Sequence, residues 1–168
     1  MRNRKELLQI KNLTVSLYAK EGLTKIVYGV NLKVHEGETV GLIGPSGSGK
    51  TVTARAIAGI LQPIGEPLWK IEGEVLYKDK DLLKLSEEEF RELRGNEISM
   101  IFQKPKSSLH PIHIIGYQTG EPVEAHENIE RERLRKMVED YLGKVELPDA
   151  TKRFFSFRHQ LSGGEAQR

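Results

Sequence analysis

The residues best suited to chemistry in this sequence form a glycine-rich loop, GPSGSGKT, at positions 44–51. The loop fits the pattern G-x-x-x-x-G-K-[ST]. Glycines let the backbone fold around a phosphate with its N–H groups pointing inward, and a following helix adds free amides. The lysine brings a positive charge to the β- and γ-phosphates, and the threonine hydroxyl is a ligand for Mg²⁺. The residues predicted to bind a nucleoside triphosphate are Gly44, Pro45, Ser46, Gly47, Ser48, Gly49, Lys50 and Thr51.

A second element with phosphate-binding chemistry is LSGGEAQR, at positions 161–168. Ser162 supplies a hydroxyl, while Gly163 and Gly164 let a helix N-terminus approach an anion without side-chain obstruction. Taken alone, serine and two glycines before a helix are more often a simple helix cap. Because a complete phosphate loop stands upstream, we predict that Ser162, Gly163 and Gly164 also contact phosphate.

The elements that must position the phosphate loop are predicted from apolar runs and turn residues. An apolar strand, 39–43, runs into the loop, and an amphipathic helix, 50–61, follows it until Pro63. Residues 62–70 contain two prolines and a glycine and are predicted to form a loop. Three further strands are predicted at 7–17, 25–34 and 71–77.

The second half of the chain is predicted to be richer in helices. Ser86 and Glu89 form a capping-box pattern that opens a short helix ending at Gly95. The remaining predicted elements are a strand at 97–102, a loop or short turns over 103–120, a helix at 130–142 that Gly143 ends, and a final helix capped by Ser162.

Composition restricts the class of protein. The 26 basic and 24 acidic residues leave a net charge of +2, which argues against a dedicated nucleic-acid binder. The chain has no cysteine, so disulfides and thiolate metal sites are excluded. No apolar run reaches the roughly 18 residues of a membrane span, and the charged N-terminus does not look like a secretory signal.

The octet at 161–168 resembles the signature motif of ATP-binding cassette (ABC) ATPases. ISMIFQKP, 98–105, resembles the strand that leads to the glutamine loop of that family, which gives Gln103 a contact with Mg²⁺ or the attacking water. QKPKSSLHP, 103–111, and GYQTGEPVEAH, 116–126, resemble stretches of the oligopeptide, dipeptide and nickel importer group. The segments 51–61 and 73–83 match that group as well, so the resemblance covers nearly the whole chain.

The resemblance implies an α/β fold: a P-loop NTPase core with an N-terminal antiparallel β subdomain, an α-helical subdomain and an incomplete C-terminal part. It implies one partial ABC ATPase domain over 1–168, with the β subdomain and P-loop core in 1–102. The glutamine loop, helical subdomain and signature then occupy 103–168. The implied function is that of the ATP-binding subunit of an importer for peptides, cytoplasmic and peripheral on the inner face of the cell membrane.

The implied cofactors are ATP and Mg²⁺, the latter bound by Thr51 and Gln103. The implied partners are a second ABC ATPase subunit, the same or different, then the transmembrane permease subunits and, indirectly, a solute-binding protein. No nucleic acid is expected. In the family, each ATP lies between Lys50 and Thr51 of one subunit and Ser162 and Gly164 of the other.

The family activity is ATP hydrolysis, and the resemblance places its Walker B Asp and Glu and its switch His after the signature. None of them stands in these 168 residues, so we expect little or no hydrolysis by this chain alone. Two alternatives stay open. One is an ABC ATPase of DNA repair or translation without transport, and the other is a nucleotide-binding fragment without catalysis.

Several residues depart from the family pattern. His110 stands where an asparagine is usual, Arg158 where a proline is frequent, and Glu165 and Ala166 replace the more usual residues of the signature. The nearest candidate for the aromatic residue that stacks on adenine is Tyr18, with Tyr28 a weaker one, and a tyrosine on a strand face is the alternative. The interleaved basic and aromatic residues of 153–158 favour packing against the signature helix over a nucleic-acid surface.

Overall fold

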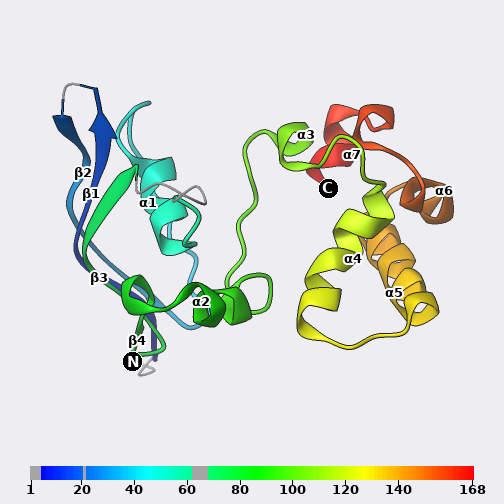
Figure 1. Ribbon diagram of the computed structural model, residues 1–168, viewed down its shortest axis with the longest axis horizontal. Coiled ribbons are helices and arrows are strands. Elements are labelled where there is room, and N and C mark those ends of the chain that lie inside the picture. Colours follow the sequence, from blue (N-terminus) through cyan, green and yellow to red (C-terminus); the bar gives the residue numbers. More distant parts are fainter. Residues whose placement is uncertain (1–4, 21, 62–67) are drawn as a thin grey trace. The chain divides into compact units, whose positions relative to one another are not determined.

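A four-stranded antiparallel sheet in the order β2-β1-β3-β4 forms the first half of the computed structural model (Figure 1). The structure describes residues 5–20, 22–61 and 68–168. Most of the predicted loop at 62–70 therefore lies outside the described residues. The strands are β1 (Glu6–Ala19), β2 (Gly22–His35), β3 (Trp69–Tyr77) and the short β4 (Lys80–Asp81). The first three confirm the strands predicted at 7–17, 25–34 and 71–77.

The sheet forms because apolar residues on its three long strands share one face. β1 lies in the middle and pairs with β2 and β3, so Val15 is opposite Val27 on one side and Ile71 on the other. Side chains alternate between the two faces of a strand, so register decides which residues are enclosed. The buried apolar residues of this face include Ile10, Leu13, Val15, Val27 and Val75.

Helix α1 (Lys50–Ile57) is shorter than the predicted helix at 50–61. Gly59 has a φ of 63°, in the left-handed region that ends helices, and a Cβ at this position would lie 2.6 Å from the ring of Phe90. The helix therefore ends at this glycine, before Pro63, because only glycine fits both the dihedral angle and the close packing.

Two predicted strands, 39–43 and 97–102, are wrong. A strand requires a hydrogen-bonded neighbour, and neither segment joins the sheet in the part of the chain that the structure describes. Ile43 is 96% exposed and Ile101 is 84% exposed. Their apolar composition fits a strand buried on both faces, but composition carries no information about whether a partner strand is present.

The second half of the described chain is helical. Its helices are α3 (Pro105–Ser108), α4 (Ile115–His126), α5 (Arg131–Lys144), α6 (Ala150–Phe154) and α7 (Gly163–Gln167). They enclose a core of Ile115, Val138, Leu142, Leu147 and Leu161, against which Phe154 packs. The predicted helix at 130–142 is confirmed by α5, but the predicted stop at Gly143 is wrong, because the helix continues through this glycine to Lys144. The final helix capped by Ser162 is confirmed by α7.

The prediction of a loop or short turns over 103–120 is wrong for the residues that form the start of α4. The helix was not predicted because its glycines and its internal proline, Pro122, are residues that disfavour helices. A Cβ at Gly116 would collide with the ring of Phe154, so glycine allows α6 to pack closely against α4. This contact packs Phe154 against α4 rather than against the signature helix, and the next residue, Phe155, is 52% exposed.

Helix α2 (Glu87–Leu93) has the predicted capping box. The Glu89 N–H donates to Ser86 Oγ at 3.2 Å, and the Ser86 N–H donates to Glu89 Oε2 at 2.8 Å. This short helix confirms that the spacing of serine and glutamate marks a helix start in this chain.

The chain divides into two compact units, Met1–Arg94 and Gly95–Arg168. The first unit contains the sheet, the phosphate loop, α1 and α2, and the second contains the helices from α3 to α7. The predicted division at residue 102 stays a prediction. Among the described residues, no helix has both the length and the apolar character needed to cross a membrane.

Candidate nucleotide-binding site

The phosphate loop connects residues 39–43 to α1 through backbone angles that favour glycine. Gly47 and Gly49 have φ values of 81° and 86°, and Gly49 is the N-cap of α1. A Cβ at Gly49 would lie 3.1 Å from Val27 Cγ2 and 3.2 Å from the Ile26 carbonyl, so the loop also lies close against β2. Gly47 and Gly49 are thus required by the loop itself as well as by any ligand.

The ammonium group of Lys50 folds back into the loop. Its Nζ donates to the carbonyl oxygens of Gly44 and Pro45, both at 2.7 Å, and to Ser48 Oγ at 3.2 Å. A lysine ammonium has three donors, and this arrangement uses all of them. A phosphate that binds to Lys50 must therefore replace at least one bond to the loop.

The surroundings of the loop suit an anion with a bound cation. Gly44 to Ser48 are exposed, as is Thr51 on the first turn of α1. That turn has no acidic residue, so its free amides and the Lys50 charge are not opposed locally. Within the described ranges, no cluster of three His, Cys, Asp or Glu residues can hold a metal. A cation here would depend on the Thr51 hydroxyl together with oxygen atoms of the ligand and water.

The structure separates the two tyrosine candidates for adenine stacking. Val27, which faces Gly49, is only 3% exposed, whereas its neighbour Tyr28 is 73% exposed and so is not packed against the loop. Tyr18 lies near the end of β1, is 52% exposed and remains the better candidate.

Gln103 lies in the second unit, in a bend just before α3. Its side chain is exposed. Because the phosphate loop belongs to the first unit, the Mg²⁺ or water contact of Gln103 stays a prediction.

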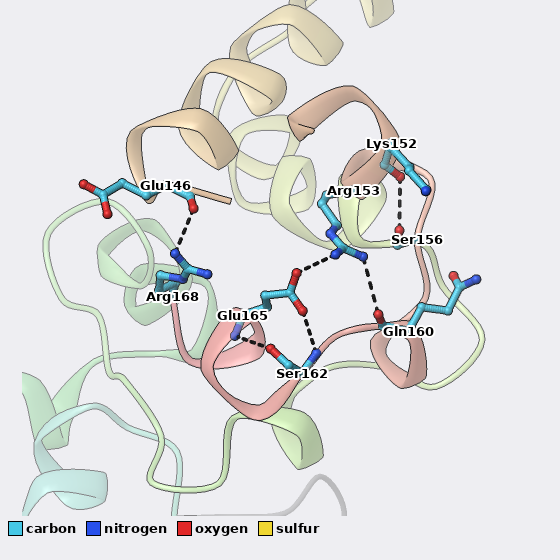
Figure 2. A network of polar contacts seen from close by, with 8 residues as sticks. All are labelled: Glu146, Lys152, Arg153, Ser156, Gln160, Ser162, Glu165 and Arg168. Atoms are coloured by element: carbon cyan, nitrogen blue, oxygen red, sulfur yellow. Dashed lines mark hydrogen bonds and ion pairs between the residues drawn. The ribbon is translucent and has the colours of Figure 1, made fainter. Parts of the chain in front are cut away.

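The signature turn, residues 161–165, is a capping box at the start of α7 (Figure 2). The Glu165 N–H donates to Ser162 Oγ at 3.2 Å, while the Ser162 N–H donates to Glu165 Oε2 at 2.7 Å. Ser162 is therefore held in place through both its backbone N–H and its hydroxyl oxygen.

Arg153 of α6 joins this turn to the rest of the helical unit (Figure 2). Its Nη2 lies 2.5 Å from Glu165 Oε1, and its Nη1 donates to the Gln160 carbonyl at 3.4 Å. The side chains of Arg153 and Glu165 are only 21% and 12% exposed, so the pair is largely enclosed. The acidic residue of the signature is thus neutralised by a cation from a neighbouring helix.

Sequence reasoning missed this network. The spacing S-x-x-E from Ser162 to Glu165 is the same capping-box signal that predicts the helix start at Ser86 and Glu89. Nothing in the sequence marked Arg153, because its contact with Glu165 depends on how α6 and α7 pack.

The capping boxes make stability sensitive to acid. Hydrogen bonds from the Ser162 backbone and hydroxyl, and then the charges of Arg153 and Arg168, hold the pKa of Glu165 below its ordinary value of 4.5. A carboxyl with a lowered pKa in the folded state stabilises the fold above that ordinary value, and this stability is lost as pH falls through the folded pKa. We predict a urea midpoint that falls as the pH drops from about 5 to about 3, and a weaker fall in Glu165→Gln. An equal pH slope in both proteins would contradict this assignment.

Comparison with known proteins agrees with the geometry. The model of the ABC transporter family matches residues 27–168. The chain is 41% identical over 162 residues to an oligopeptide transport ATP-binding protein of Bacillus subtilis, covering 96% of this chain and 45% of that protein. It is 39% identical over 163 residues to a dipeptide transport ATP-binding protein of the same organism, covering 97% and 48% respectively. The chain therefore spans about half the length of these relatives.

Solved structures give the same result for the fold. A dimeric bacterial ABC transporter cassette matches with a TM-score of 0.80 and 28% identity, over 96% of this chain and 66% of that one. The same cassette in a post-hydrolysis state with ADP and phosphate matches with a TM-score of 0.77 and 27% identity, over the same shares of the two chains. The family match, which extends from β2 through the phosphate loop to the signature turn, shows that this chain belongs to the ABC transporter family.

Proposed function

We propose that this chain is the nucleotide-binding part of an ATPase subunit in an ABC importer for peptides. ATP binds with its phosphates on the 44–51 loop, next to Lys50 and Thr51. The signature turn of a second subunit, through Ser162, Gly163 and Gly164, closes over the γ-phosphate. Binding brings the two subunits together, and hydrolysis in the assembled transporter separates them again.

The observation that carries this proposal is the environment of Gly163 and Gly164. A Cβ added at either residue would meet nothing within 4 Å, and neither glycine has a positive φ. Glycine in a helix costs about 1 kcal/mol relative to alanine. Since neither the backbone angles nor the packing of this chain requires glycine here, the space in front of both residues suits the close approach of another molecule.

Mg²⁺ fits this proposal through its ligand chemistry. Mg²⁺ prefers oxygen ligands and keeps several waters or phosphate oxygens, so it needs few protein ligands. We assign the Thr51 hydroxyl and the Gln103 side-chain oxygen to it. When bound, the ion neutralises charge on the β- and γ-phosphates.

The relatives support the role in transport. Both Bacillus subtilis proteins are named as peptide transport ATP-binding proteins, at 39% and 41% identity to this chain. We therefore assign a peptide as the transported solute, permease subunits and a solute-binding protein as partners, and the inner face of the cell membrane as the location.

The glycine argument gives a direct test. Gly163→Ala and Gly164→Ala are expected to leave thermal stability unchanged or raise it by up to about 1 kcal/mol each. Each is expected to weaken ATP-dependent self-association about tenfold, because a methyl group enters the surface of closest approach. The measurements are thermal unfolding and analytical ultracentrifugation with ATP and Mg²⁺.

Gly59→Ala is the matched control. Gly59 has a positive φ and touches Phe90, so the same change should destabilise the first unit by about 1–3 kcal/mol. If Gly163→Ala and Gly164→Ala destabilise the fold in the same way and leave association unchanged, the two glycines are structural and the proposal fails.

A further inference from the structure

Arg158 joins two segments that are far apart in the sequence. Its Nη1 donates to the carbonyl oxygen of Leu109 at 2.7 Å and to that of Lys106 at 3.0 Å. Both carbonyls belong to α3 or its C-cap, and this helix begins two residues after Gln103. Arg158 itself stands four residues before Ser162. One side chain thus spans from the glutamine segment, residues 103–109, to the approach to the signature turn.

The backbone that carries Arg158 is firmly held. The Gln160 N–H donates to the Phe157 carbonyl at 2.9 Å, and the Phe157 N–H donates to Gln160 Oε1 at 2.7 Å. The Arg158 carbonyl in turn accepts from the Leu161 N–H at 3.4 Å, and Leu161 is buried in the core of the helical unit. A displacement of Arg158 would therefore reach the residue next to Ser162.

The chemistry of the contact suits a guanidinium group. Carbonyls at the C-terminal end of a helix have no intrahelical partner and carry partial negative charge, which a cation stabilises. No carboxylate among the described residues forms an ion pair with Arg158, so this cation is committed to the two carbonyls. The planar guanidinium also fixes the direction of its donors, which a flexible ammonium does not.

Backbone contacts also join the residues just before Arg158 to the start of α4. The Ile115 N–H donates to the Ser156 carbonyl at 2.8 Å, and Ile114 forms an isolated bridge with Phe157. These contacts hold the start of α4. Arg158 extends the connection back to α3, closer to Gln103, through its long side chain.

We propose that Arg158 is a positioning residue that fixes the signature turn to α3, so that a displacement of the glutamine segment is passed on to Ser162. This inference rests on the proposed function, because it is that function which gives both segments a role. In this account the departure at position 158 matters, since a proline there could not donate to either carbonyl.

The test uses the absence of cysteine from the chain. Cysteines introduced at the exposed positions Lys106 and Gln167 take spin labels specifically, and dipolar spectra report the spread of distances between α3 and α7. We expect a narrow distribution with Arg158, a broad one with Arg158→Met, and an intermediate one with Arg158→Lys. Arg133→Met is the matched control, because Arg133 is an exposed residue of α5 in the same unit.

The second readout is nucleotide-dependent. Arg158→Met should leave ATP binding at the 44–51 loop unchanged but weaken ATP-dependent self-association about tenfold, within the usual range of coupling between sites. Arg158→Lys decides the question if Arg158→Met fails to fold. If the distribution of α3–α7 distances stays narrow and ATP-dependent self-association is unchanged in Arg158→Met and Arg158→Lys, Arg158 does not have the proposed role. If the parent chain does not associate with ATP, the proposed function fails, while the dipolar spectra still decide whether Arg158 holds α3 to the signature turn.

Discussion

Replacing Lys50 with alanine is expected to weaken the binding of ATP by about a hundredfold. Two charge-assisted hydrogen bonds to phosphate, at roughly 1.5–3 kcal/mol each, account for a loss of this size. The variant also loses the bonds from Nζ to the Gly44 and Pro45 carbonyls, so the loop is less ordered before it binds. Isothermal titration calorimetry with ATP and Mg²⁺ measures the change.

Lys136→Ala is the control for loss of charge. Lys136 is exposed on α5 in the second unit, so its replacement should leave ATP affinity unchanged. Equal affinity of the parent chain and Lys50→Ala would show that the 44–51 loop does not bind the phosphates, whatever its sequence.

Replacing Arg153 with methionine is expected to lower the melting temperature of the helical unit on the order of 5 °C. The change removes the ion-pair partner of the largely enclosed Glu165 carboxylate and leaves only the charge of Arg168 to offset it, which is more costly than the loss of a surface pair. Methionine retains much of the apolar volume of the arginine stem, which separates loss of charge from loss of packing. Differential scanning calorimetry measures the shift.

The partner variant makes the test specific. Glu165→Gln keeps an oxygen acceptor for the Ser162 N–H but removes the charge, so Arg153→Met should cost much less stability in that background. Arg133→Met, an exposed change in the same unit, should have no effect. A loss of the same size with and without the Glu165 charge would mean that Arg153 acts through packing alone.

The parts of the fold that the sequence predicted are those fixed by neighbouring residues. Alternation of apolar residues placed β1, β2 and β3, and the spacing of Ser86 and Glu89 placed the start of α2. In each case the signal and its cause lie within a few residues of each other. The same is true of the phosphate loop, whose glycines determine its backbone angles.

The errors involve contacts between distant residues. The apolar segments 39–43 and 97–102 have the composition of strands but no partner in the sheet that the structure describes. Helix α4 was missed because Gly116 is explained only by the ring of Phe154, which lies far along the sequence. The contacts of Arg153 and Arg158 could not be predicted from the sequence for the same reason, since both depend on tertiary packing.

The central claim is that the 44–51 loop and the signature turn complete one ATP site between two subunits. Mixing two defective variants tests it most directly, with ATP-dependent association measured by analytical ultracentrifugation. Lys50→Ala lacks a working loop, and Gly164→Asp places a negative charge where the phosphate should approach, so neither should associate alone. In a mixed dimer the intact loop of one chain meets the intact signature of the other. The account predicts that the mixture associates when ATP and Mg²⁺ are added, and a mixture that stays monomeric while the parent chain associates would contradict it.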